Sequence, residues 1–164
     1  MSGDDGVFIR PPTDIRNKVS VGGPGSVDQA ALARAEKVIL DMAGSFVDMV
    51  HEDVANLHKE LEALKSNGGD AATLDNIYRM THDIKGQGGS FKYDLITTIS
   101  RQLCNFIEEL KGNVKPADIE VIALHVDALQ VVIAQDLKGD GGDVGSNLLS
   151  GLEKVIAKRS SGQD

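Results

Sequence analysis

Residues 96–112 read ITTISRQLCNFIEELKG, and their apolar residues repeat with the period of a helix that has one buried face. The repeat consists of Ile96, Ile99, Leu103, Phe106 and Leu110, at spacings of three, four, three and four. Gly112, shortly after the last of them, is a frequent helix terminator. This stretch therefore predicts an amphipathic helix whose apolar face packs against other helices.

The same repeat occurs on both sides of this helix. It runs over residues 32–64, as one helix or as two broken near Gly44, and recurs over residues 74–84, 119–133 and 148–156. The links between these stretches are short, and no segment alternates apolar and polar residues as a strand would. The chain is therefore predicted to be all-α. We expect an up-and-down antiparallel four-helix bundle with an N-terminal arm and a short C-terminal helix.

Three parts are expected along the chain. Residues 1–25 contain RPP and GGPG and are expected to form a flexible arm, although the apolar residues 7–9 could dock on the bundle. The bundle is expected over residues 26–138, because a capping box begins at Ser26. Residues 139–164 combine the Gly-rich loop GDGGDVG with the short closing helix.

Composition narrows the class of function. Of the 164 residues, 41% are hydrophobic and only 4% aromatic, which favours an aliphatic helical core. The formal net charge of −8 argues against a nucleic acid partner, because phosphate backbones bind basic surfaces. Cys104 is the single cysteine, which excludes an internal disulfide. With no signal segment and no long apolar run, we expect a soluble cytoplasmic protein that makes no membrane contact.

Three of the four histidines suggest little chemistry. His51 and His58 lie two turns apart beside acidic residues, which could form half of a metal site but is more typical of a solvated helix face. His125 lies in an amphipathic helix without flanking site residues, so a structural role is expected. No glycine motif for ATP or another nucleotide is present, and an autonomous kinase is therefore not expected.

The fourth histidine precedes a cluster of glycines. Residues 81–93 read THDIKGQGGSFKY. A glycine inside a helix costs roughly 1 kcal/mol relative to alanine, so these glycines need a reason other than helix stability. On a helical wheel, His82 lies about 100° from the centre of the apolar face, at the solvent-exposed edge of the bundle.

The neighbours of His82 on this edge are Lys85 and Gly86 one turn later, Gly89 beyond them, and Tyr78 one turn earlier. An exposed imidazole beside an ammonium and a bare backbone suits a phosphoryl carrier. Lysine offsets the phosphoryl charge, and glycine leaves room for a carboxylate of another protein. From the residues alone, a surface histidine next to a frayed helix end is an equally good interpretation.

The order His82, Ile84, Lys85, Gly86 in HDIKG, followed by Phe91, resembles the signature of histidine-containing phosphotransfer (HPt) domains. The resemblance implies a four-helix bundle that presents an exposed histidine. That histidine would accept a phosphoryl group, through Nε2, from an aspartate of a response-regulator receiver domain or of a hybrid sensor histidine kinase. It would then pass the group to another receiver.

The resemblance also implies roles for the surrounding residues. Lys85 would provide electrostatic support, and Gly86 with Gly89 would give access to the ring. Gln87, Arg79 and Tyr78 would contact the receiver at the rim. The protein would need no cofactor or metal of its own, since the Mg²⁺ of the transfer would belong to the receiver domain.

Two departures from the family pattern affect these expectations. Lys92 stands where the family usually has a glycine, so Gly88 and Gly89 are expected to supply the flexibility of the turn earlier. Cys104 stands where many members have a Glu or Gln that hydrogen-bonds the histidine, so the residue that orients His82 is left open.

Two rival functions remain at this point. One is a helical interaction module that docks receiver domains or other partners without being phosphorylated. The other is a metal-binding bundle that uses His51 and His58.

Overall fold

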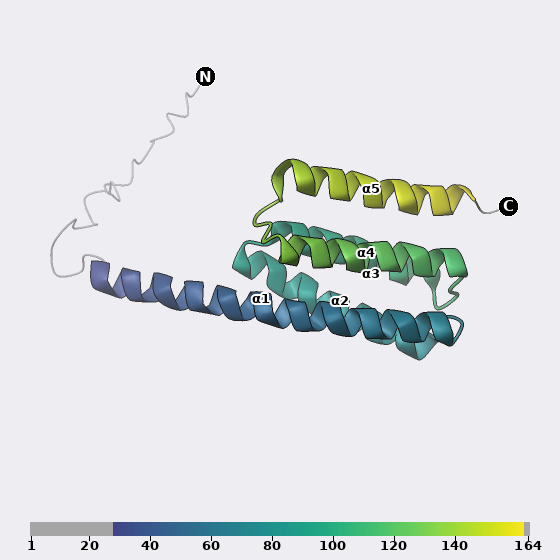
Figure 1. Cartoon of the computed structure of the whole chain (residues 1–164), viewed down its shortest axis with the longest axis horizontal. Helices are drawn as coiled ribbons and strands as arrows, with labels where there is room; N and C mark the ends of the chain where they lie inside the picture. The colour runs from purple at the N-terminus through teal and green to yellow at the C-terminus, as the bar shows by residue number, and fades with distance from the viewer. Residues whose placement is uncertain (1–27, 163–164) are drawn as a thin grey trace, which may run out of the picture. The chain divides into compact units, whose positions relative to one another are not determined.

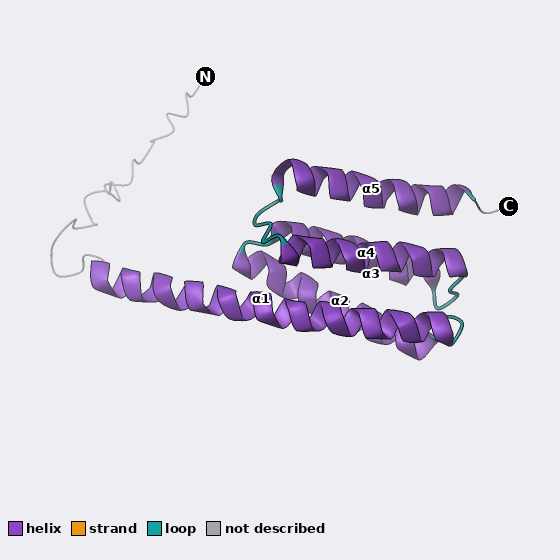
Figure 2. Ribbon diagram, viewed as in Figure 1, coloured by secondary structure: helices purple, strands orange, loops and turns teal. Residues whose placement is uncertain are grey.

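The computed structural model describes residues 28–162, and all regular elements in that range are helical (Figures 1 and 2). The prediction of an all-α bundle is confirmed. The elements are α1 (Gln29–Ser66), α2 (Ala71–Gly88), the 3₁₀ turn η2 (Gly89–Phe91), α3 (Asp94–Leu110), α4 (Pro116–Ala134) and α5 (Gly142–Ser161). The predicted arm and the Ser26 capping box lie outside the described residues.

The chain divides into two units between Asp41 and Met42. In the N-terminal unit, α1 begins directly after Asp28, whose carboxylate accepts a hydrogen bond of 2.9 Å from the Ala30 amide. This is the usual role of an Asp N-cap, which satisfies one of the free amides of the first turn. Helix α1 is continuous past Gly44, so the first of the two alternatives, one long helix, is correct.

The second unit contains the hydrophobic core. The face predicted from residues 96–110 is buried, with Ile96, Ile99 and Leu103 fully enclosed. Each such side chain contributes about 1.5 to 3 kcal/mol of burial free energy. Three aromatic rings, those of Phe46, Phe91 and Tyr93, gather near the α2–α3 turn, where Phe46 of α1 stacks on Phe91 with ring centroids 4.6 Å apart. The core is therefore mainly aliphatic, as the composition predicts.

Helix α5 packs on α3 and α4 through apolar residues and one buried ion pair. Leu152 is buried, and the Arg159 guanidinium donates from Nε to Asp118 at 2.5 Å. Asp118 is fully enclosed and also accepts from the Lys115 amide at 2.8 Å, which caps the start of α4. The Arg159 guanidinium also lies 5.7 Å from the centroid of the Phe106 ring. These contacts fix the closing helix to the bundle.

Helix α5 starts earlier than the glycine content predicts. It begins at Gly142, so residues 142–145, expected as loop, form its first turn. Gly141 precedes the helix in the left-handed conformation, with φ of 71°. A Cβ on Gly145 would lie 1.9 Å from the Asp140 carbonyl oxygen, so glycine is required for this tight entry. The glycines thus shape the start of α5 instead of preventing it.

No helix within residues 28–162 is long and apolar enough to cross a lipid bilayer.

Candidate functional site

His82 lies on the exposed side of α2. The helix starts at Asp70, whose carboxylate accepts a hydrogen bond of 3.0 Å from the Thr73 amide. From this start, Ile77 and Ile84 turn toward the core and are fully buried. His82 is consequently exposed, as its place on the helical wheel predicts.

The closest ring to His82 is Tyr78, one turn earlier on α2. The two ring centroids are 6.1 Å apart, with 33° between the planes. The Tyr78 hydroxyl donates a 2.5 Å hydrogen bond to Glu108 of α3, and this bond is the main reason that the pKa of Tyr78 is raised. Glu108 therefore belongs to the site through Tyr78. The sequence shows both residues, but only the packing of α2 on α3 pairs them.

Cys104 does not take the place of the orienting Glu or Gln by hydrogen bonding. It is 1% exposed, and burial raises the pKa of its thiol, while the positive charge of Lys85 lowers it and the charge of Glu108 raises it. Gln102, two residues earlier, has its carbonyl oxygen buried without a hydrogen-bond partner. Within residues 28–162 no side chain hydrogen-bonds the imidazole of His82, and Tyr78 is the ring that lies against it.

The three glycines after His82 differ in their surroundings. A Cβ on Gly86 would meet no atom within 4 Å, so the space one turn after His82 is open. A Cβ on Gly88 would lie 2.7 Å from Thr97 Oγ1 and 3.1 Å from the Tyr93 carbonyl oxygen, so Gly88 is required for close packing. A Cβ on Gly89 would make only an ordinary contact with Thr97, at 3.8 Å.

The turn from α2 into α3 does not depend on the backbone freedom of Gly88 and Gly89, although the sequence suggested that it would. Gly88 and Gly89 both have ordinary right-handed helical angles. Lys92 itself adopts the left-handed conformation, with φ of 62°, so that expectation is wrong. The amide of Tyr93 closes the turn by donating a 2.9 Å hydrogen bond to the Gly88 carbonyl oxygen. This hydrogen bond requires a left-handed conformation at residue 92, as at many helix C-termini.

The remaining predicted site residues lie on the same helix. Lys85 and Gln87 are half-buried, and Arg79 is exposed and forms an ion pair with Asp75 at 2.7 Å. The Lys85 carbonyl oxygen accepts a 3.4 Å bond from Thr97, which ties this part of α2 to α3. All seven residues singled out from the sequence therefore lie on α2 or in the turn that follows it, and their roles stay predictions.

The other histidines have structural contacts. His58 is half-buried and its Nε2 lies 3.0 Å from Gln130 Oε1 of α4, so it is not on a simple solvated face. His125 is fully buried, with Nδ1 2.8 Å from the Val121 carbonyl oxygen, and burial lowers its pKa. The structural role expected for His125 is confirmed. In the described part of the chain, no group of three metal-ligating side chains occurs.

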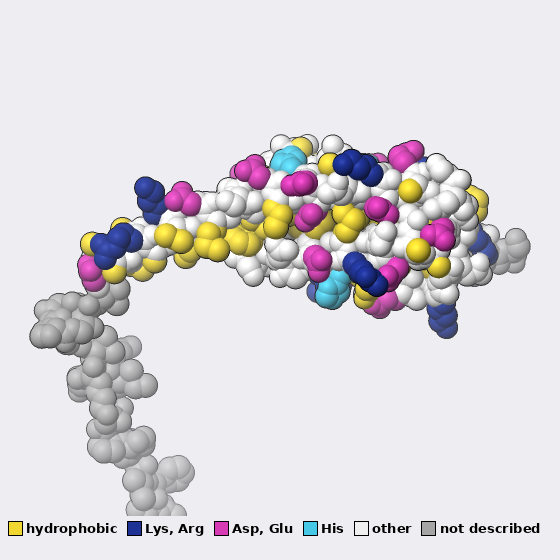
Figure 3. All heavy atoms as spheres, turned by 90° about the horizontal axis from the view of Figure 1, so that it is seen from below, with side chains coloured by type: hydrophobic (Ala, Val, Ile, Leu, Met, Phe, Trp, Pro, Cys, Tyr) yellow, Lys and Arg dark blue, Asp and Glu magenta, His cyan; other side chains and the backbone are white. Residues whose placement is uncertain are grey.

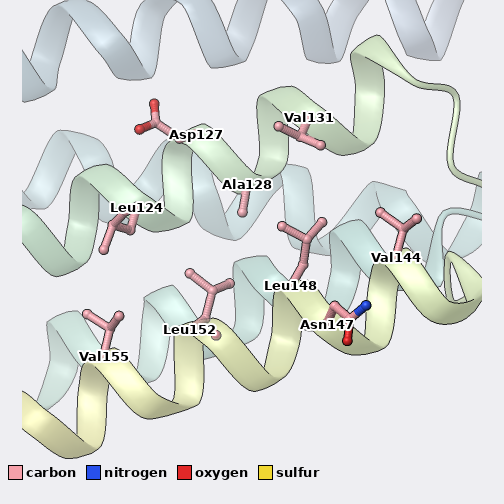
Figure 4. A pocket seen from close by; sticks show the side chains of 10 residues that line it. Leu124, Asp127, Ala128, Val131, Val144, Asn147, Leu148, Leu152 and Val155 are labelled. Carbon is pink, nitrogen blue, oxygen red and sulfur yellow. The ribbon is translucent and has the colours of Figure 1, made fainter.

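An apolar groove lies elsewhere. It has a volume of about 560 Å³ between α4 and α5, and its apolar side chains point toward one another from the two helices (Figure 4). None of its lining residues comes from α2. A smaller hollow of about 290 Å³ lies next to the site and is lined in part by Tyr78 and Glu108. His82 lines neither of these two hollows.

Comparison with known proteins agrees with this geometry. The sequence model of the Hpt domain matches residues 41–132. The chemotaxis protein CheA of Salmonella typhimurium is 25% identical over 97 residues, which cover 59% of this chain and 14% of that protein. The chain thus corresponds to a small part of this much longer relative. No solved structure matches significantly. Because the family match covers more than half of the chain and includes the exposed histidine of α2, the chain belongs to the Hpt domain family.

Proposed function

We propose that this protein is a phosphohistidine carrier in which His82 accepts a phosphoryl group from a receiver-domain aspartate and passes it to a second receiver. The observation that carries the proposal is the access to the imidazole. His82 is exposed, and the space over Gly86 is open on the side from which a partner would approach.

In the proposed step, the Nε2 lone pair of a neutral imidazole attacks the phosphorus of the aspartyl phosphate. The N–P bond forms, the P–O bond to the aspartate breaks, and the aspartate leaves as a carboxylate. The proton on Nδ1 remains on the ring, so no acid or base is consumed. The return step to a second receiver is the reverse of this reaction. We assign the Mg²⁺ of the exchange to the receiver domain.

Two neighbours are proposed to support the step. The ammonium of Lys85, one turn from His82, partly offsets the charge of the phosphoryl group. The ring of Tyr78, held by its hydrogen bond to Glu108, limits the rotation of the imidazole. Neither residue forms a covalent bond with the phosphoryl group, so each is a positioning or electrostatic residue. Arg79, Gln87 and Gly89 lie at the rim, where they are proposed to contact the receiver.

We place the exchange in the cytoplasm, consistent with the free thiol of Cys104.

The proposal is tested by phosphotransfer from a panel of phosphorylated receiver domains. We expect the wild type to gain a label that acid removes and base preserves, which is the behaviour of a phosphorylated histidine. The variant His82→Gln should lose this label completely and keep the helical circular dichroism spectrum, since residue 82 makes no core contact.

The matched control is His51→Gln, because His51 is also exposed but lies on α1. Label that persists in His82→Gln and disappears from His51→Gln would refute the assignment. A wild type that binds receivers without gaining any label would instead support the interaction module that docks partners without phosphorylation.

A further inference from the structure

The first part of α1 exposes large apolar side chains along its length (Figure 3). Those with exposed fractions near or above one half are Leu32 (44%), Val38 (56%), Ile39 (60%), Leu40 (70%) and Met42 (52%). Single exposed apolar residues are normal on protein surfaces, but a contiguous group on one helix indicates an interaction surface. This surface is independent of the chemistry proposed for His82.

Part of this surface has the spacing of a coiled coil, and we call its four residues, Leu32, Ala35, Ile39 and Met42, the α1 seam. These residues follow one another at intervals of three, four and three residues. They fall within an arc of about 80° on a helical wheel. Arg34, Lys37 and Asp41 fall on the opposite side, and Glu36 lies about 40° beyond Leu32, between it and Leu40, so no charge falls within the arc of the seam. Helices with this repeat pack knob-into-hole against a helix with the same repeat, and a second copy of the chain supplies one.

Charge disfavours a lipid surface as the occupant. Residues 28–41 contain three acidic residues (Asp28, Glu36, Asp41) and two basic ones (Arg34, Lys37), so their net charge is 2 − 3 = −1. Helices that bind anionic membranes are instead rich in lysine and arginine on the polar face. The Arg34 guanidinium is also engaged with Asp28, at 3.6 Å. The segment thus lacks the positive charge that would draw it to a bilayer.

We infer that the α1 seam is a dimerisation surface, on which residues 32–42 of two copies of this chain pack against each other. Two such faces would bury on the order of 1,000 Å², near the lower limit for a specific interface. The dimer is therefore expected to be weak and reversible. Each dimer carries two copies of His82.

The test is sedimentation velocity of the full chain over a series of concentrations from about 1 to several hundred micromolar. The mean mass of the wild type should rise from one chain toward two. Ile39→Glu places a charge in the centre of the seam and should raise the dissociation constant at least about tenfold. Leu32→Glu tests the other end of the seam and should act in the same direction. Both positions are exposed, so the helical spectrum should not change.

The matched control is Leu124→Glu, since Leu124 is 43% exposed on α4 and lines the groove between α4 and α5. It should leave the association unchanged. A wild type that stays monomeric at the highest concentration would overturn the inference, as would a dimer lost in Leu124→Glu but kept in Ile39→Glu.

Two further measurements identify a different occupant. If the wild type is monomeric and removal of residues 1–25 produces a dimer, the chain's own N-terminal segment covers the seam, and the inference is wrong. If monomeric wild type floats with vesicles of phosphatidylethanolamine and phosphatidylglycerol and Ile39→Glu does not, the seam binds lipid, which also overturns it.

Discussion

Gly86, on the exposed side of α2, and Gly88, at the turn from α2 into α3, are only two residues apart in the sequence. The physical reasons for glycine at these two positions differ. On the exposed side, a side chain at Gly86 would meet no atom within 4 Å. In the turn, a side chain at Gly88 would clash with Thr97 and crowd the Tyr93 backbone. The space at Gly86 is open and, in the proposed function, admits another protein, whereas Gly88 leaves space for the neighbouring helix α3.

A glycine near a reactive residue is therefore not by itself evidence of a functional role. Replacing a glycine that gives access to His82 should leave the free energy of unfolding nearly unchanged but slow phosphotransfer. A residue kept for packing should show the opposite behaviour. Substitutions at Gly86 and Gly88 separate the two cases, and substitutions at Lys92 test the backbone of the turn.

The largest effect is expected for Gly86→Leu. Leucine is the better helix former by something under 1 kcal/mol, so the melting temperature should stay the same or rise. The new side chain projects toward the N-terminus of α2, and therefore toward His82, where it should slow transfer from a receiver at least about tenfold. Thermal melting and transfer from one receiver measure the two effects. Transfer at the wild-type rate would show that the open space over Gly86 is not used.

A smaller effect, on stability, is expected for Gly88→Ala. The added methyl group would lie 2.7 Å from Thr97 Oγ1. Thr97 would therefore have to move, which would loosen the packing of α2 on α3. Overpacking of this kind typically costs about 1 to 3 kcal/mol, and the gain in helix propensity offsets up to about 1 kcal/mol of it, which leaves a loss of up to about 2 kcal/mol. Urea denaturation measures the free energy of unfolding.

The matched control is Gly86→Ala, where the methyl group meets no atom and should stabilise the protein by up to about 1 kcal/mol. Equal effects of alanine at positions 86 and 88 would contradict the distinction between the two regions.

The smallest effect is expected for Lys92→Gly. Lys92 has a left-handed backbone, which disfavours residues with a Cβ by about 1 to 2 kcal/mol. Glycine relieves this strain but has more freedom in the unfolded chain, so a net gain of up to about 1 kcal/mol is expected. Lys92→Ala removes the same side chain without relieving the backbone and should not stabilise. A gain of equal size in both variants would assign the effect to the lysine side chain instead.

Much of the fold could be predicted from the sequence, because helix positions depend on local periodicity. The repeat from Ile96 to Leu110, the break after Asn67 and the start at Pro116 all correspond to observed helix boundaries within a few residues. The exposure of His82 follows from the same periodicity, since its place relative to the buried Ile77 and Ile84 is fixed by the helix itself.

The start of α5 and the path after Gly89 could not be predicted in the same way. Glycines normally argue against a helix, but Gly145 is used where α5 passes close to the Asp140 carbonyl oxygen. The left-handed residue of the turn is Lys92, a residue type with no preference for that conformation, because the packing of Tyr93 and Gly88 determines the path. Local propensity was overruled in both places by contacts with residues outside the segment.

The sequence by itself determined that the chain forms amphipathic helices, that His82 faces solvent, and that Lys85 and Gly86 lie beside it, because each of these depends on residues within one or two helical turns. Only the tertiary structure decided which residues from different helices meet. Tyr78 pairs with Glu108, Asp118 with Arg159 and His58 with Gln130, across separations of 30, 41 and 72 residues. Such pairs depend on how the helices are rotated and shifted against one another. That arrangement is set by the close packing of the whole core rather than by any single segment.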